Sequence, residues 1–208
     1  MNSATQALSL QGAAGAIEAL CDTPENGVFR GTAVIAHPHP LFGGTMQNKV
    51  VQTLARAFVQ CGWQAVRFNF RGVGASAGTY DEGRGEAADM LAVIRQVAPQ
   101  GPLALAGFSF GAFVTSQVAQ ALAPERHIDK LVLVGTAASR FGVAPVAPEL
   151  HEQTLVLHGE QDDTVPLASV LDWARPQFLP VTVIPGVEHF FHGQLPLLKT
   201  LVARHLRA

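Results

Sequence analysis

The chain has 208 residues, a length that suits one compact domain with a sizeable core, and we expect a single domain over residues 1–208. Hydrophobic residues make up 48% of the chain and charged residues 14%, a balance that excludes extensive disorder. The formal net charge is −2 and the basic residues do not cluster. We therefore expect neither a nucleic-acid partner nor a membrane-binding surface.

The first twenty residues contain neither a basic segment nor an unbroken apolar stretch, so we expect no signal peptide. No apolar stretch in the sequence is long enough to cross a bilayer. The two cysteines, Cys21 and Cys61, stand in different contexts, and we expect two free buried thiols. These features predict a cytoplasmic protein. We expect it to be a monomer or a homodimer.

Short apolar runs alternate with longer amphipathic segments along the whole chain. The predicted strands are 7–11, 16–21, 32–36, 65–70, 103–108, 131–134, 154–158 and 181–184, and the predicted helices are 47–60, 86–97, 111–123, 167–178 and 194–204. The first two strands flank a glycine-containing turn and predict an antiparallel hairpin at a sheet edge. The rest is typical of an α/β protein with a mainly parallel sheet of about seven to eight strands and helices on both faces.

Residues 107–111 read G-F-S-F-G between a predicted strand and a predicted helix. This pattern predicts a sharp turn that lifts the side chain of Ser109 clear of the sheet. Small residues are needed two positions on either side because strand and helix pass close together, and Gly107 and Gly111 meet that need. The sequence therefore predicts Ser109 as a nucleophile at a helix N-terminus.

A serine hydroxyl needs a neighbouring base, and in this arrangement the acid and then the histidine follow the serine along the chain. His189 lies just past the last predicted strand, in a loop that would face the serine, and is the predicted general base. His192, one helical turn further on, is the alternative.

The acid that orients the histidine is expected after the strand 154–158. Asp162 and Asp163 are adjacent there, and one of them can bind the imidazole while the other turns outward or caps a helix. Glu160 is a weaker candidate.

A tetrahedral intermediate needs two hydrogen-bond donors at its oxygen, and the N–H of Phe110 is the first predicted donor. The second is expected in the turn after the strand 32–36, where Pro38 and Pro40 have no N–H. The N–H of His39 is the predicted donor, with that of Leu41 as the alternative.

Two neighbouring patterns point to other chemistry more weakly. His37 and His39 form an H-x-H pair without a suitably spaced third ligand, so we expect no metal. The glycine-rich turn 71–78 has the wrong spacing for a dinucleotide loop, so we expect no cofactor. Arg71 in that turn is expected either to form a buried ion pair or to contact a substrate.

Five segments resemble the α/β-hydrolase superfamily in the order in which the family has them, and are most similar to small, capless, dienelactone-hydrolase-like bacterial hydrolases. They are HPHPLFGGTMQNKVV, RFNFRGVGASAG, GFSFGA, HGEQDDTVP and GVEHFFHG. The first aspartate of the fourth segment is the family's acid, so the resemblance implies a triad of Ser109, Asp162 and His189. Dienelactone hydrolases commonly have a cysteine nucleophile where this chain has serine, so the resemblance does not extend to the dienelactone substrate.

Fewer than twenty residues separate the predicted strands that end at Val134 and begin at Thr154, where many relatives insert a lid. We therefore expect no large cap and a small-molecule substrate. The leading hypothesis is a serine hydrolase that cleaves a small carboxylic ester or thioester through an acyl-serine intermediate. The alternatives are a non-catalytic ligand-binding or scaffold protein on the same fold, and an acyl transferase or perhydrolase with the same triad.

Overall fold

The computed structural model describes residues 5–24 and 27–208, in which eight strands form one sheet. The strands are β1 (Thr5–Gly12), β2 (Gly15–Asp22), β3 (Gly31–Ala36), β4 (Trp63–Phe68), β5 (Leu103–Phe108), β6 (Lys130–Val134), β7 (Thr154–Gly159) and β8 (Val181–Ile184). The longer helices are α1 (Lys49–Gln60), α2 (Arg84–Val97), α3 (Phe110–Leu122), α4 (Leu167–Ala174) and α5 (Leu195–Arg207). Residues 1–4, part of the segment examined for a signal peptide, lie outside the described residues.

The strand order is β1-β2-β4-β3-β5-β6-β7-β8. The pairs β1–β2 and β2–β4 are antiparallel, and every other neighbouring pair is parallel. The predicted α/β class, the mainly parallel sheet and the antiparallel N-terminal edge are confirmed.

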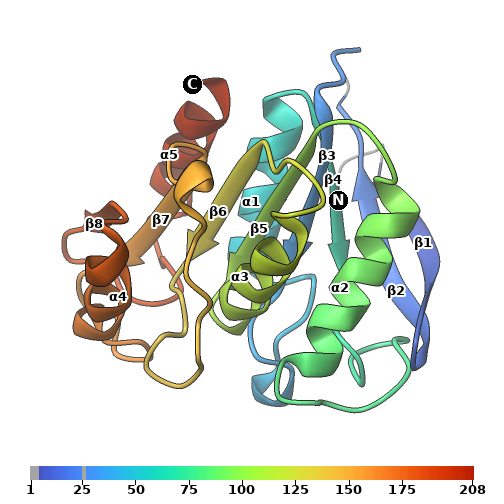
Figure 1. Ribbon diagram of the computed structural model, residues 1–208, viewed down its shortest axis with the longest axis horizontal. Coiled ribbons are helices and arrows are strands. Elements are labelled where there is room, and N and C mark those ends of the chain that lie inside the picture. Colours follow the sequence, from blue (N-terminus) through green and yellow to red (C-terminus); the bar gives the residue numbers. More distant parts are fainter. Residues whose placement is uncertain (1–4, 25–26) are drawn as a thin grey trace.

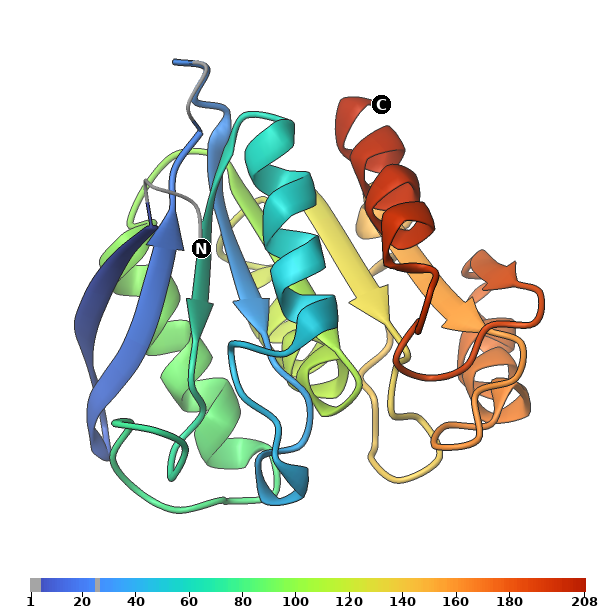
Figure 2. The same ribbon diagram turned by 180° about the vertical axis from the view of Figure 1, so that it is seen from behind.

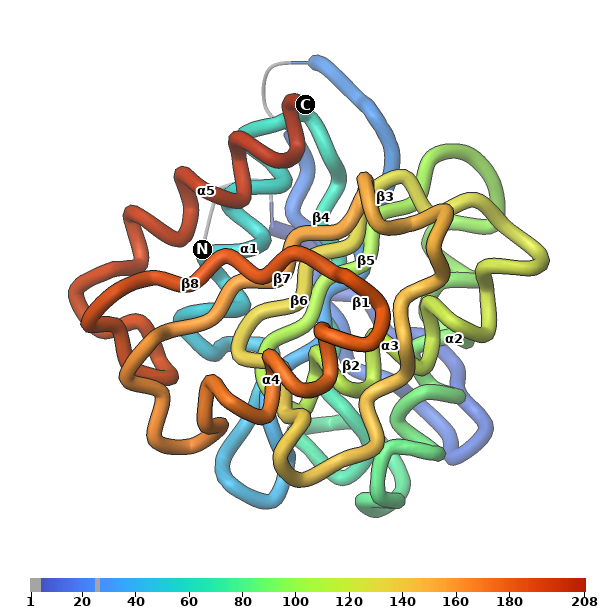
Figure 3. The backbone as a smooth tube through the Cα atoms, turned by 60° about the vertical axis from the view of Figure 1, so that its left-hand side comes forward, coloured from blue at the N-terminus to red at the C-terminus, as the bar shows by residue number. Residues whose placement is uncertain are grey.

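Helices cover both faces of the sheet. Helices α2, α3 and α4 lie on one face (Figure 1), and α1 and α5 pack side by side on the other (Figure 2). Figure 3, with the β8 edge brought forward, shows the same division into three layers. The strands between the helix layers are apolar on both faces, and all six residues of β3 are buried, as the uninterrupted run of apolar residues predicts.

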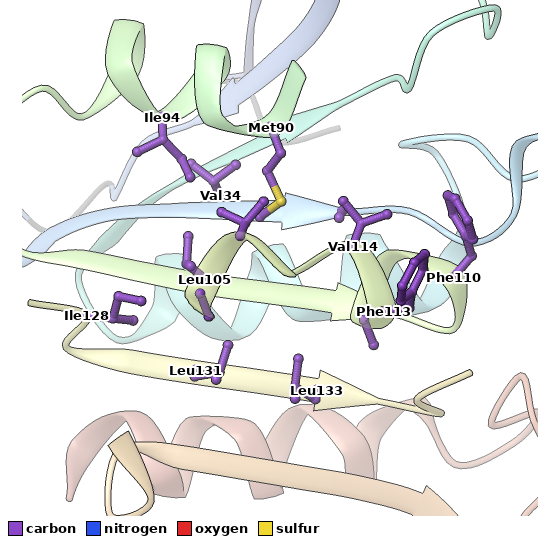
Figure 4. Close-up of a cluster of buried hydrophobic side chains, with 14 of the residues drawn as sticks. Val34, Met90, Ile94, Leu105, Phe110, Phe113, Val114, Ile128, Leu131 and Leu133 are labelled. Carbon is purple, nitrogen blue, oxygen red and sulfur yellow. The ribbon is translucent and has the colours of Figure 1, made fainter. Parts of the chain in front are cut away.

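Each face of the sheet has its own apolar core. On the α2–α3 face, side chains of both helices meet those of β3, β5 and β6 (Figure 4). The labelled residues of this cluster are Val34, Met90, Ile94, Leu105, Phe110, Phe113, Val114, Ile128, Leu131 and Leu133. Burying one such side chain stabilises the fold by roughly 1.5–3 kcal/mol, so these two layers fix the strands rigidly beneath the loops.

Two predicted elements end earlier than the sequence indicates. The predicted helix 167–178 is wrong in its last turn: α4 stops at Ala174 and a 3-10 turn follows, because Pro176 has no N–H to continue the helix. The predicted strand 65–70 ends at Phe68, since the N–H of Phe70 donates to His37 instead of to a neighbouring strand. The other boundaries differ from the prediction by at most three residues.

The structure also places Arg71 and the two cysteines, for which the sequence gives expectations. Arg71 forms a bidentate ion pair with Asp89, at 2.8 and 2.9 Å, which is the first of the two expected roles, and it does not line the cavities beside Ser109. Cys21 and Cys61 are both free and buried, as expected.

The carboxyl ends of the parallel strands lie at one end of the sheet, where the loops after β3, β5, β6 and β7 gather (Figure 2). β3 and β5 are neighbours in the sheet although the chain visits β4 between them. The connections leave β3 and β5 in opposite directions, and a crevice forms at such a point in an open α/β sheet. The fold therefore places the loop after β3 beside the segment that follows β5.

Two glycines allow α3 to start close to the strands. A Cβ at Gly107 would lie 2.3 Å from the carbonyl oxygen of Gly111. A Cβ at Gly111 would lie 2.4 and 2.5 Å from the carbonyl oxygens of Ala36 and His37. Because the obstructing atoms are backbone, neither position can accept a larger residue without displacing the strand end.

We expect Gly111→Ala to lower the free energy of unfolding by about 1–3 kcal/mol, because the added methyl group has no space. The matched control is Gly142→Ala, since nothing lies within 4 Å of a Cβ there, and its effect should stay within about 0.5 kcal/mol. Urea unfolding of the two variants measures the difference. Equal stability of both variants would show that α3 does not lie as close to β3 as described.

Candidate active site

Ser109 occupies the tight turn between β5 and α3. Its backbone angles, φ 58° and ψ −119°, are unusual for a residue with a side chain, and its N–H donates to the carbonyl of Val134 at 2.8 Å. Strained backbone of this kind persists only where the surrounding structure holds it in place. The two close-packed glycines and the β6 contact do so here, and Ser109 stands at the N-terminus of α3, as predicted.

His189 lies next to Ser109 although 80 residues separate them. Its Nε2 is 3.0 Å from the Ser109 Oγ, and its Nδ1 is 2.6 Å from the Asp162 Oδ2. The imidazole packs against Phe108 and Phe190, with ring centroids 4.9 and 5.0 Å away. The structure therefore brings the predicted serine, histidine and first aspartate into one hydrogen-bonded chain.

Backbone contacts between two loops hold the acid and the histidine in register. The N–H of Gln161 donates to the carbonyl of Val187 at 2.9 Å. The Asp162 Oδ1 accepts from the N–H groups of Thr164 and Val165, at 3.0 and 2.7 Å. The Oδ2 is left facing His189, so the carboxylate is oriented from both sides.

The alternative residues point elsewhere. Asp163 is exposed and accepts a hydrogen bond from the hydroxyl of its neighbour Thr164, at 3.3 Å. Glu160 accepts from the N–H of Gly186 at 2.9 Å. His192 is exposed and lies 3.1 Å from Glu188. Of the candidates, only Asp162 and His189 connect to Ser109.

A second buried imidazole, that of His158, touches the same aspartate. Its Nε2 lies 2.9 Å from the Val165 carbonyl, to which it donates, and 3.5 Å from the Asp162 Oδ2. Burial lowers the pKa of His158, so its ring supports this turn in the neutral form. No role for His158 was predicted from the sequence, although it directly precedes Gly159 at the end of β7.

The loop after β3 folds back sharply around His39. The carbonyl of His39 accepts from Phe42 and Gly44, and its Nδ1 accepts from the N–H of Leu41 at 3.2 Å. The N–H of Leu41, the alternative predicted donor, is thus already used in a hydrogen bond to His39. Within the described ranges, the N–H groups of His39 and Phe110 have no hydrogen-bond partner, and the rings of these two residues lie 4.8 Å apart.

His37 ties this loop to the end of β4. It is fully buried, its Nε2 accepts from the N–H of Phe70 at 2.9 Å, and its Nδ1 lies 2.6 Å from the carbonyl of Pro38. An imidazole that accepts at one nitrogen and donates at the other is neutral. Burial lowers the pKa of His37 to about 4.

A cavity of about 360 Å³ opens in front of Ser109. Its walls combine apolar side chains with a few polar groups: Pro38, His39, Phe42, Gly43, Gly44, Asn48, Arg140, Thr164, His189 and Phe190 line it beside Ser109. Phe42 and Phe190 are exposed at the rim. Arg140 comes from the segment after β6, for which no part in the site was predicted from the sequence.

Among residues 5–24 and 27–208, no group of three or more His, Cys, Asp or Glu side chains has a metal-binding arrangement. The turn 71–78 lies outside the lining of the cavity. In the same part of the chain, no helix is long and apolar enough to span a membrane.

The family model of the α/β-hydrolase fold matches residues 38–148, more than half of the chain. An uncharacterised protein of Rickettsia prowazekii is 31% identical over 170 residues, which cover 76% of this chain and 71% of that protein. The chain belongs to the α/β-hydrolase family.

Among solved structures, the chain is similar to serine hydrolases of this fold. A lidless α/β serine hydrolase of Xanthomonas campestris is 37% identical, with a TM-score of 0.88 over 100% of this chain and 95% of that one. An α/β serine hydrolase homologue of Coxiella burnetii is 38% identical, with a TM-score of 0.81 over 97% of both chains. The fold is that of hydrolytic enzymes, and the predicted absence of a lid is confirmed.

The buried neutral state of His37 predicts a pH-dependent stability. Its folded-state pKa lies below the ordinary value of about 6.5, so the unfolded chain binds more protons as the pH falls towards 4. The His37 contribution is complete above about pH 6.5, and about 2 kcal/mol of it should be lost between pH 7 and pH 5. Denaturant unfolding at the two pH values measures the change.

His205, whose pKa burial also lowers to about 4, adds to the same slope. The His37 share is therefore the difference between the wild type and His37→Gln. An NMR titration of the wild-type histidines gives the same quantity without a variant. A His37 imidazole that titrates near pH 6.5 would contradict the buried neutral ring.

Proposed function

We propose that the protein is a serine hydrolase that cleaves small carboxylic esters or thioesters through an acyl-serine intermediate. The observation that carries the proposal is the hydrogen-bonded chain from the Ser109 Oγ through His189 to Asp162. A hydroxyl becomes a nucleophile when a positioned base takes its proton, and these distances lie within the reach of such a transfer.

In the first half of the reaction, the Ser109 Oγ attacks the carbonyl carbon while its proton passes to the Nε2 of His189. The Asp162 carboxylate, 2.6 Å from the Nδ1, stabilises the imidazolium that forms. The tetrahedral intermediate then expels the alcohol or thiol, which takes the proton from His189. The acyl group remains on Ser109.

The N–H groups of Phe110 and His39 are the proposed donors to the negative oxygen of this intermediate. Both are free of other partners in the described chain, and the α3 N-terminus adds a favourable dipole beside Ser109. His37 and the prolines of the loop fix the position of the His39 amide. Such donors are most effective when they are already in place before charge develops.

In the second half, water attacks the acyl-serine with His189 as the base, and the free acid leaves with Ser109 restored. No lid encloses the site, so water reaches it directly, and the cavity of about 360 Å³ suits a small substrate. The exposed Phe42 and Phe190 provide apolar contact for its carbon chain.

A fluorophosphonate probe is expected to label Ser109 covalently, because it reacts with serines activated by a base. Ser109→Ala should abolish labelling and His189→Ala should slow it by several orders of magnitude. Mass spectrometry of the labelled peptide identifies the site. Folded wild-type protein that remains unlabelled would contradict the proposal and favour a ligand-binding role.

The adjacent aspartates give a matched pair of variants. Asp162→Asn should lower kcat for p-nitrophenyl butyrate by roughly 10³–10⁴-fold. The amide oxygen is expected to keep the N–H groups of Thr164 and Val165, so the NH2 group, which can only donate, faces the Nδ1 of His189 and favours the wrong tautomer. Asp163→Asn, at an exposed side chain, should leave kcat within about twofold. Comparable losses in the two variants would refute the assignment of the acid.

A further inference from the structure

One charged side chain, that of Arg140, lines the cavity in front of Ser109. A smaller cavity of about 50 Å³ also borders Ser109, and Arg140 lines it as well, together with Phe110, Ala137 and Phe141. Among the residues that the structure describes, no Asp, Glu or Lys lines either cavity. Arg140 therefore stands where the two spaces around the proposed nucleophile meet.

Arg140 has no counterion within residues 5–24 and 27–208, and it is exposed. Several other arginines of the chain are paired with carboxylates: Arg67 with Asp22, Arg71 with Asp89, Arg84 with Asp81 and Glu82, and Arg175 with Asp172. The guanidinium of Arg140 is thus left available to a ligand.

The charge of Arg140 also acts on the loop after β3. The pKa of His39 is lowered, mainly by burial; Glu86 opposes this change and Arg140 adds to it. The guanidinium therefore lies within electrostatic range of the loop that holds a proposed oxyanion donor. Phe42, Phe110 and Phe141 line the same space, so apolar rings flank the guanidinium.

We infer that Arg140 is a specificity-determining residue, and that the preferred substrates are esters that carry a second, anionic group, most simply a carboxylate, within reach of its guanidinium. A planar guanidinium binds a carboxylate through two parallel hydrogen bonds, which a neutral ester cannot reproduce. The inference rests on the proposed hydrolase function and specifies the substrate of the same site.

Two pairs of esters test the inference, each pair differing in one charge. The first pair is mono-p-nitrophenyl adipate and its methyl ester, with the charge on the acyl side. The second is para-acetoxybenzoate and its methyl ester, with the charge on the leaving group. The measured quantity is the ratio of kcat/KM for the anionic ester to that for the neutral ester.

In at least one pair, Arg140→Gln should lower this ratio by about tenfold or more, and Arg140→Glu should lower it further. Added salt should reduce the wild-type ratio and leave that of Arg140→Gln nearly unchanged. The control is Arg95→Gln, an exposed arginine near the end of α2 that lines neither cavity, which should keep the wild-type ratio. An unchanged ratio for both pairs in the Arg140 variants would overturn the inference.

Failure of the proposed function gives a different result. In that case, fluorophosphonate does not label Ser109 and none of the esters is hydrolysed. Calorimetric binding of the two anionic esters to Ser109→Ala, with and without Arg140→Gln, then tests the ion pair without turnover. Affinity that falls about tenfold on removal of the guanidinium supports the Arg140 site, and unchanged or absent binding overturns it.

Discussion

The hydrogen bond between the Asp162 carboxylate and the His189 Nδ1 is the interaction on which the arrangement of the site depends. It is 2.6 Å long and buried, and it fixes which nitrogen of the imidazole faces Ser109. Without it the ring could rotate or adopt the other tautomer, and the Nε2 would not be held ready to accept from the Ser109 hydroxyl. Much of the surrounding structure keeps these two side chains together.

Several independent contacts serve that purpose. Backbone N–H groups hold one oxygen of the carboxylate, and the neutral ring of His158 supports the same turn through the carbonyl of Val165. The rings of Phe108 and Phe190 pack against the His189 imidazole. Beneath them, two apolar layers fix the strand ends, so the loops start from rigid positions.

Much of this arrangement could be predicted from the sequence, because its signals are local. The apolar runs predicted the sheet and its helices, and G-F-S-F-G predicted the turn that carries Ser109. Because the acid and then the histidine must follow the serine in the sequence, only a few residues could be its hydrogen-bonded partners. Adjacent aspartates share one local pattern, however, and only the folded backbone shows that Asp162 turns inward while Asp163 stays in solvent.

The features that the sequence did not predict are those that depend on distant parts of the chain. His37 ends β4 early through a bond across 33 residues, and no local pattern in 65–70 indicates it. Arg140 lies in an irregular segment after β6, and its approach to Ser109 depends on how that segment crosses the sheet end. A lone arginine in a loop carries no pattern that would identify it as a residue lining this cavity.

The most direct test of the hydrogen bond between Asp162 and His189 is NMR of protein labelled with nitrogen-15 at histidine. The spectra are recorded at a pH where the His189 ring is neutral. The nitrogen shifts and ring-proton couplings report which nitrogen carries the proton. We predict a proton on Nδ1, strongly deshielded by Asp162, and an unprotonated Nε2 towards Ser109. A His189 ring with its proton on Nε2 would contradict this prediction.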